Sequence, residues 1–276
     1  MLTPLLMVAD IAPPTWGIFA EEMVVPTIFV TAFVATVYVM ISRARAGEPI
    51  PPIRKIAGLD AMDEAIGRAT EMGRPVHYSP GISPITNAQT IASFAVLGYV
   101  AKMCAQYDTQ LIQTNRQYIV HAVTEEIVQQ ADLEAGRPDA YNPDDVRYIS
   151  GFQFGYAAGV LGIFQREKPA ANIMYGSFFA ESMIFLEAAN QIGAIQIAGT
   201  ASVAQLPFFI AAADYTLIGE EMYAASAYIS KEPILRGTVV GQDIFRIVLF
   251  ALIAIGTIVE QINPEDNPVT RILTSF

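Results

Sequence analysis

A stretch of 19 residues without a charged side chain, residues 23–41, constrains the fold of this chain more than any other feature. At about 1.5 Å of rise per residue, a helix of this length spans roughly 28 Å, close to the hydrocarbon thickness of a bilayer. The alternative is a buried core helix, but core helices of this length rarely lack a polar face. We therefore predict a transmembrane helix over residues 23–42.

The basic residues around this stretch indicate its orientation. The first 42 residues contain no Lys or Arg, whereas Arg43, Arg45, Arg54 and Lys55 follow closely. By the positive-inside rule, residues 1–22 are then extracytoplasmic, and the chain beyond the linker of residues 43–56 is cytoplasmic. The lack of a positive segment before the apolar stretch argues against a cleaved signal peptide.

A second apolar stretch, residues 247–259, is short for a full span. Its extension toward the N-terminus includes Arg246, whose long side chain can reach the cytoplasmic face. We predict a second transmembrane helix over residues 244–260 and an extracytoplasmic tail over residues 261–276, with a buried terminal helix or a re-entrant segment as alternatives. Both termini would then lie outside the cell membrane, with a cytoplasmic domain of residues 57–243 between the helices.

Composition excludes several classes of protein. A net charge of −11 argues against nucleic-acid binding, and 53% hydrophobic residues exclude a disordered chain. The single cysteine, Cys104, excludes an intramolecular disulfide and a thiolate zinc site. The two histidines, His77 and His121, have no local metal-binding spacing, so we expect no metal and no cofactor.

The central domain alternates short apolar segments with helical ones. Strands are expected at residues 75–78, 111–114, 172–175 and 195–198, and helices at 83–106, 116–135, 152–165 and 178–192. This alternation predicts an α/β fold with a Rossmann-like parallel sheet. Ser83 and Pro84 are expected to be the N-cap and first residue of a helix. Residues 201–229 are interpreted as core helices that face the membrane or another subunit.

In open parallel sheets, ligands bind beyond the carboxyl ends of the strands. Small and polar residues stand at these positions, where helix N-termini favour phosphate or carboxylate groups. The same residue types are ordinary caps and turn residues, and no Walker A or GxGxxG motif is present, so a purely structural role stays open. The candidate ligand-binding residues are Ser79, Gly81, Ser83, Thr114, Asn115, Arg116, Gly176, Ser177, Glu181, Gly199 and Thr200.

Several acidic residues raise separate questions. Glu181 is either a base or ligand-binding acid, or a surface charge or a partner of the dipole of its own helix. Asp214, Glu220 and Glu221 stand among apolar residues, where an unpaired charge is costly. Together with Gln205, they are predicted to form either a polar pocket or an inter-subunit contact, with an exposed helix face as the alternative.

A set of segments carries a family resemblance. The segments are LDAMDEAIGRATEMGRPVHYSPG, GSFFAES, IQIAGT, QLPFF and DYTLIGEEMYAASAY. Together they resemble an uncharacterised prokaryotic membrane-protein family, domain of unknown function 6754, over roughly residues 56–246. The resemblance implies an architecture and no activity. It singles out residues inside the segments: Gly176, Ser177, Glu181, Thr200, Gln205, Asp214, Glu220 and Glu221.

Two hypotheses of function follow. The first is a membrane-anchored, non-enzymatic subunit or scaffold, whose cytoplasmic domain self-associates or docks membrane-complex subunits. It rests on the apolar residues 152–164 and 201–229 and on the lack of a catalytic motif, because a large apolar surface usually marks an interface. Its partners would be membrane lipid and further copies of the chain, without nucleic acid. The second is an enzyme that binds a nucleotide or small anion at the strand ends.

Overall fold

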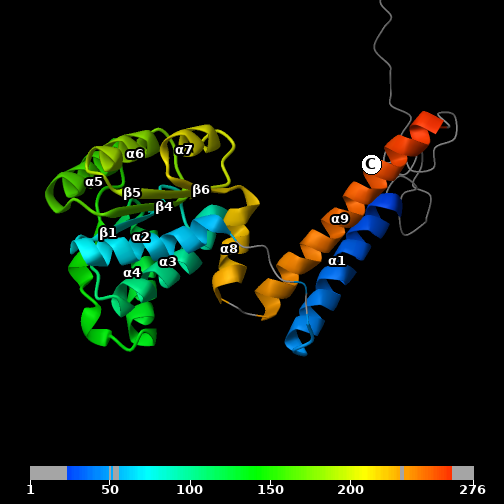
Figure 1. Cartoon of the computed structure of the whole chain (residues 1–276), viewed down its shortest axis with the longest axis horizontal. Helices are drawn as coiled ribbons and strands as arrows, with labels where there is room; N and C mark the ends of the chain where they lie inside the picture. The colour runs from blue at the N-terminus through cyan, green and yellow to red at the C-terminus, as the bar shows by residue number, and fades with distance from the viewer. Residues whose placement is uncertain (1–23, 50, 52–55, 231–232, 263–276) are drawn as a thin grey trace, which may run out of the picture. The chain divides into compact units, whose positions relative to one another are not determined.

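The computed structural model describes residues 24–49, 51, 56–230 and 233–262 (Figure 1). The chain divides into two compact units. One contains the first and last helices, α1 (Val24–Arg45) and most of α9 (Pro233–Ile262). The other, Ile53–Leu235, contains the sheet. Each unit is treated by itself below.

In the first unit, α1 and α9 pack antiparallel. A side chain at Gly237 would come within 2.7 Å of Ile41 Cα, and one at Gly241 within 2.8 Å of Val37 Cα. Further along, the ring of Phe245 contacts the ring of Phe33. Two glycines four residues apart thus allow the backbones to approach closely, as in small-xxx-small helix contacts.

Three helices in the described residues have the length and composition to cross a membrane: Thr27–Arg45, Ala88–Gln106 and Pro233–Val259. Half of the second helix is buried, because it packs inside the sheet unit. The last helix begins at Pro233, well before the start at residue 244 that we predicted. Proline suits the first turn of a helix, and Gly237 and Gly241 continue the helix because they pack against α1.

The second unit is built on six parallel strands: β1 (Val76–Gly81), β2 (Leu111–Asn115), β3 (Val146–Tyr148), β4 (Ala171–Ser177), β5 (Ile195–Thr200) and β6 (Tyr215–Ile218). Their order is β3-β2-β1-β4-β5-β6, and every neighbouring pair is parallel. The predicted α/β class with a parallel sheet is therefore confirmed. The strand order reverses between β1 and β4, which makes this pair the topological switch point of the sheet.

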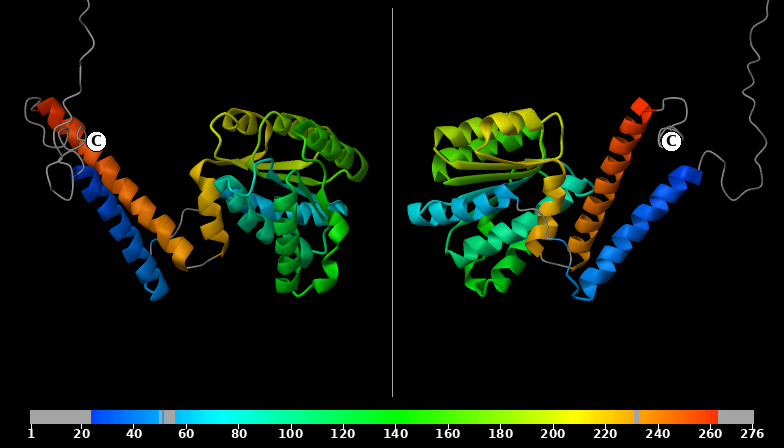
Figure 2. Two further views of the ribbon diagram at one scale, coloured as in Figure 1. Left: turned by 180° about the vertical axis from the view of Figure 1, so that it is seen from behind. Right: turned by 45° about the vertical axis from the view of Figure 1, so that its right-hand side comes forward.

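Helices cover both faces of the sheet (Figures 1 and 2). One face carries α2 (Ala57–Met72), α3 (Ala88–Gln106), α4 (Tyr118–Glu134) and α8 (Glu220–Ser230). The other carries α5 (Gln153–Glu167), α6 (Glu181–Gln191) and α7 (Leu206–Ala212). Two short 3-10 helices, η2 (Pro138–Ala140) and η3 (Pro143–Asp145), lead into β3.

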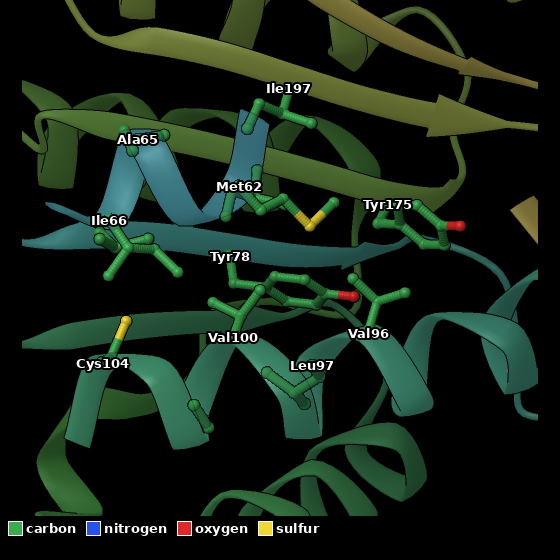
Figure 3. Packing of buried hydrophobic residues seen from close by; sticks show 14 of the residues in the cluster. Met62, Ala65, Ile66, Tyr78, Val96, Leu97, Val100, Cys104, Tyr175 and Ile197 are labelled. Atoms are coloured by element: carbon green, nitrogen blue, oxygen red, sulfur yellow. The ribbon is translucent and has the colours of Figure 1, made fainter. Parts of the chain in front are cut away.

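The core on the α3 face is aliphatic with buried tyrosines (Figure 3). Tyr78 lies over Val96 and Val100, and its hydroxyl donates to Ser93 O at 2.7 Å. Burial raises the pKa of Tyr78 well above its usual value, so the ring stays neutral. Each fully buried aliphatic side chain of this core contributes roughly 1.5–3 kcal/mol. The apolar character of α3 is thus explained by packing in the core.

Two sequence-based predictions are wrong in detail. Ser83 is not the N-cap of α3: the helix begins at Ala88, and the N-cap Asn87 accepts from Gln89 N at 2.8 Å. Pro84 instead begins a turn, closed by a hydrogen bond from Asn87 N to Pro84 O. Residues 201–229 are not all helical, because β6 lies between α7 and α8. The short end strands β3 and β6 were missed since each buries only one side chain, which leaves no alternating pattern.

Candidate functional site at the carboxyl end of the sheet

At the switch point, the backbones of β1 and β4 touch. Gly81 has a φ of +90°, and a Cβ there would collide with Ser177 O. A Cβ on Gly176 would likewise collide with Pro80 O, and Ile82 N donates to Ser177 O at 2.9 Å. Glycine is required at both positions because the two strands approach too closely for a side chain. β1 and β4 therefore stay paired as far as Gly81 and Ser177, at the end of the sheet where ligand binding was predicted.

Arg116, directly after β2, connects two loops at this end of the sheet. Its Nη1 donates to Ile82 O at 2.9 Å, and its Nε donates to Gly151 O at 3.0 Å. Ile82 follows β1, and Gly151 lies between β3 and α5. The guanidinium thus fixes the loops after β1 and β3 against each other. Arg116 was predicted to bind an anion, but these N–H groups donate to backbone carbonyls instead.

The other candidates at the strand ends also bond within the fold. Thr200 Oγ1 donates to Gln89 Oε1 at 3.0 Å, and Ser182 Oγ donates to Gln205 Oε1 at 2.9 Å. Asn115 Nδ2 donates to Thr124 Oγ1 at 3.0 Å. Three further candidates are also part of the packed fold. Gly199 packs against the Tyr175 ring, and Ser177 is the buried last residue of β4. The backbone oxygen of Ser83 accepts from Thr90 Oγ1.

Glu181 is fully buried at the first position of α6. Its Oε1 accepts from Phe179 N at 2.8 Å, and its Oε2 accepts from Gln153 Nε2. An acid in the first turn is favoured by the helix dipole and by free backbone N–H groups. Glu181 thus holds the turn that precedes α6 and, through Gln153, ties α6 to the start of α5.

A buried polar network that the sequence analysis did not identify lies deeper in the sheet. His77 on β1 bonds through Nδ1 to Asn172 Oδ1 at 2.8 Å and through Nε2 to Thr114 Oγ1 at 2.9 Å. The network continues through the Tyr156 hydroxyl to Ser79. Its signal in the sequence was the two-residue spacing of His77 and Ser79, which places both on one face of β1.

Burial determines the protonation of this network. Desolvation lowers the pKa of His77 from 6.5 to about 4, so the imidazole is neutral at pH 7. Burial likewise raises the pKa of Tyr156 to about 12. Beside the network, Asn172 Nδ2 and Gln196 Oε1 are buried atoms without a hydrogen-bond partner in the described part of the chain. Asn172 and Gln196 are neighbours in register on β4 and β5.

The acidic residues of the last third are separated by the fold. Asp214 precedes β6 at the amino end of the sheet, where its Oδ2 accepts from Gln196 N at 2.8 Å. It lines a cavity of about 500 Å³ together with Glu64 and Arg68 of α2, a feature that the sequence did not indicate. Glu220 and Glu221 begin α8, and Glu221 Oε2 accepts from Ile218 N. The four predicted pocket or interface residues, Gln205 included, therefore do not form one group.

Large apolar side chains are exposed around the carboxyl end of the sheet. Phe152 is 84% exposed, Phe154 70% and Tyr118 72%, although each stands near the first turn of a helix. We call this set the carboxyl-end rim: Tyr118, Ile119, Tyr148, Phe152, Phe154, Phe179, Val203 and Phe208. All follow or end strands β2 to β5, and parallel strands end on the same side. The available signal in the sequence was an aromatic residue a few positions after a strand, as at Tyr118, Phe152 and Phe179.

The described residues thus define an α/β domain with a parallel sheet, in one chain with two long apolar helices. Residues 14–270 match the model of a family described as a domain of unknown function (DUF6754), and the chain belongs to this family. The match confirms the resemblance inferred from the sequence segments. No curated protein and no solved structure matches the chain. Within the described residues, no group of three His, Cys, Asp or Glu side chains could hold a metal ion.

Proposed function

We propose that this protein is a membrane-anchored, non-enzymatic subunit, whose cytoplasmic α/β domain self-associates at the cell membrane. The observation that carries the proposal is the carboxyl-end rim. It exposes aromatic side chains at the place where a ligand-binding sheet would open its crevice. The polar groups around that place instead bond to one another and to backbone.

The anchor in this proposal is the pair α1 and α9. Ile28, Val30 and Val34 of α1 are more than half exposed, as are Ile247 and Ile258 of α9. Such side chains on both helices suit contact with lipid, and the helical backbone satisfies its own hydrogen bonds there. By the positive-inside rule, the charge pattern favours an orientation with both termini outside and the sheet unit in the cytoplasm.

The rim is the proposed contact of the sheet unit. Soluble folded domains rarely expose contiguous large apolar surfaces, and such surfaces usually mark interfaces. Aromatic residues are also enriched at the centres of protein interfaces, where each buries a large area. A second copy of the chain is the proposed partner because the same rim is then buried on both subunits.

Two measurements on the full chain test this proposal. After a sodium carbonate wash, the protein is expected to stay with the membrane pellet. In mild detergent, light scattering with a correction for bound detergent is expected to give a protein mass above that of one 30.0 kDa chain. Release by carbonate would contradict the anchor, and a single protomer at micromolar concentration would contradict self-association.

One observation favours the alternative enzyme. The strand order β3-β2-β1-β4-β5-β6 is that of doubly wound dinucleotide-binding sheets, so a Rossmann-like domain is a reasonable interpretation. In such a domain, nucleotide would bind beside Ser177 at the switch point. A rise in the melting temperature with ATP or NAD, abolished by Ser177→Glu, would support the alternative. Unchanged melting with both nucleotides would count against it.

A further inference from the structure

The register of α1 against α9 fixes the depth of two charged residues. Phe245 packs against Phe33, which lies one residue from the middle of the uncharged stretch of residues 23–41. Asp243 and Arg246 stand two residues and one residue from Phe245, hence about 3 Å and 1.5 Å away along the helix axis. If α1 spans the bilayer, both charges lie within a few ångströms of its middle.

These two residues face away from α1. Gly237, Gly241 and Phe245 form the side of α9 that contacts α1. Because a helix turns about 100° per residue, Asp243 and Arg246 lie on roughly the opposite side. Their side chains are 51% and 42% exposed, and Arg246 Nη1 lies 3.4 Å from Asp243 Oδ1. The outward face of α9 therefore carries an ion pair at mid-depth.

Exposing an ion pair to lipid at this depth is costly. Charged side chains at the bilayer centre are costly and almost always face protein or water. We propose that the outward face of α9 binds the same face of a second copy, through Asp243 and Arg246. The inference rests on the proposed function, since it requires α1 and α9 to cross the membrane, and it names the membrane part of the self-association.

The charges identify a second copy as the partner. The face carries one acid and one base a single turn apart, so it is complementary to itself. Around a two-fold axis along the membrane normal, Asp243 of each copy can meet Arg246 of the other. Phe250 lies about two turns from Asp243 on the same face and is 65% exposed, which supplies an apolar contact beside the charges.

Cysteine crosslinking in membranes tests the arrangement. The background is Cys104→Ala, which removes the one native thiol. Phe250→Cys places a thiol on the proposed interface, and Thr31→Cys places one on the exposed side of α1. With copper phenanthroline, we expect a disulfide-linked dimer for the first variant and none for the second. Absence of the Phe250→Cys dimer, or equal crosslinking of both variants, would overturn the inference.

Variants of the two charged residues provide a second test. In the Phe250→Cys background, Asp243→Arg is expected to lower the crosslinked fraction about tenfold, since like charges then meet at low dielectric. The exchange Asp243→Arg with Arg246→Asp restores complementarity and is expected to restore the dimer. A double variant as low as the single one would contradict the proposal. Carbonate resistance of each variant, measured first, separates this failure from failure of the membrane anchor.

Discussion

The ring of Phe245 packs edge-on against the ring of Phe33, with centroids 5.2 Å apart and planes at 67°. This contact sets the register of α1 against α9. The same register brings Gly241 against the backbone at Val37 and Gly237 against the backbone at Ile41. The pairing of the first and last helices therefore depends on two glycines and an aromatic contact.

The first prediction concerns Gly241. Leucine at this position would collide with the α1 backbone, so Gly241→Leu is expected to separate the helices. Cysteines at Phe33 and Phe245, in the Cys104→Ala background, report the separation through a short bifunctional maleimide. We expect loss of the intramolecular crosslink for Gly241→Leu and its retention for the matched variant Ala254→Leu, whose site is exposed. Equal crosslinking in both would contradict the register.

The second prediction concerns His77 and pH. Its folded-state pKa of about 4 lies below the ordinary 6.5, so the unfolded chain takes up a proton that the folded chain does not. The stability linked to neutral His77 is complete above pH 6.5 and is lost as the pH falls toward 4, by roughly 3 kcal/mol. Urea unfolding of the full chain in detergent is expected to show a shallower pH slope for His77→Gln. The control Thr124→Ala, which removes no titratable group, should keep the wild-type slope. An identical slope for all three proteins would contradict the prediction.

The third prediction concerns Asp132, whose effect on stability changes with pH in the opposite direction to that of His77. Burial raises the pKa of this α4 carboxyl from 3.8 to about 6. The folded chain therefore holds the proton more tightly, and stability falls as the pH rises from 3.8 to about 6. Asp132→Asn is expected to stabilise the protein above pH 6, by on the order of 1 kcal/mol, with a smaller gain at pH 4.5. A gain that is the same at both values of pH would show that burial of the charge is not its cause.

The sheet could be predicted from the sequence where strands are buried on both faces. β1, β2, β4 and β5 were located because each is a short apolar segment followed by a helix. Their ends were placed too early, since Gly81, Ser177 and Thr200 resemble turn residues although they are the last strand residues. Their conformation depends on the neighbouring strand, which a local pattern cannot reveal.

The candidate site could be predicted less well. The candidates lie at the carboxyl end of the sheet, although most of them are strand residues, and their hydrogen-bond partners come from distant segments. Arg116 bonds to Gly151, and Thr200 bonds to Gln89. Such pairs depend on tertiary contacts, as does the exposure of Phe152 and Phe154. Asp214 was grouped with Glu220 by sequence proximity, yet the strand β6 separates them.

The fourth prediction concerns Gly81. A side chain there would need a left-handed φ of +90° and would collide with Ser177 O. Gly81→Ala is expected to destabilise the sheet unit by about 2 kcal/mol or more, because strain and collision add. Chemical denaturation followed by circular dichroism measures the effect. The comparison variant is Gly67→Ala in α2, which has open space and a helical backbone and should be neutral or slightly stabilising. Equal stability of the two variants would contradict the close approach of β1 and β4.

The most direct test of a membrane-anchored subunit that self-associates through its carboxyl-end rim is the mass of the full chain in mild detergent. We expect the wild type to exceed one protomer. The double variant Phe152→Ser with Phe154→Ser, which keeps the proposed α9 contact, is expected to lose mass on dilution at a higher concentration than the wild type. Leu133→Ser, which removes an exposed apolar side chain outside the rim, should match the wild type. A wild type that is a single protomer, or a rim variant of unchanged mass at every concentration, would contradict the account.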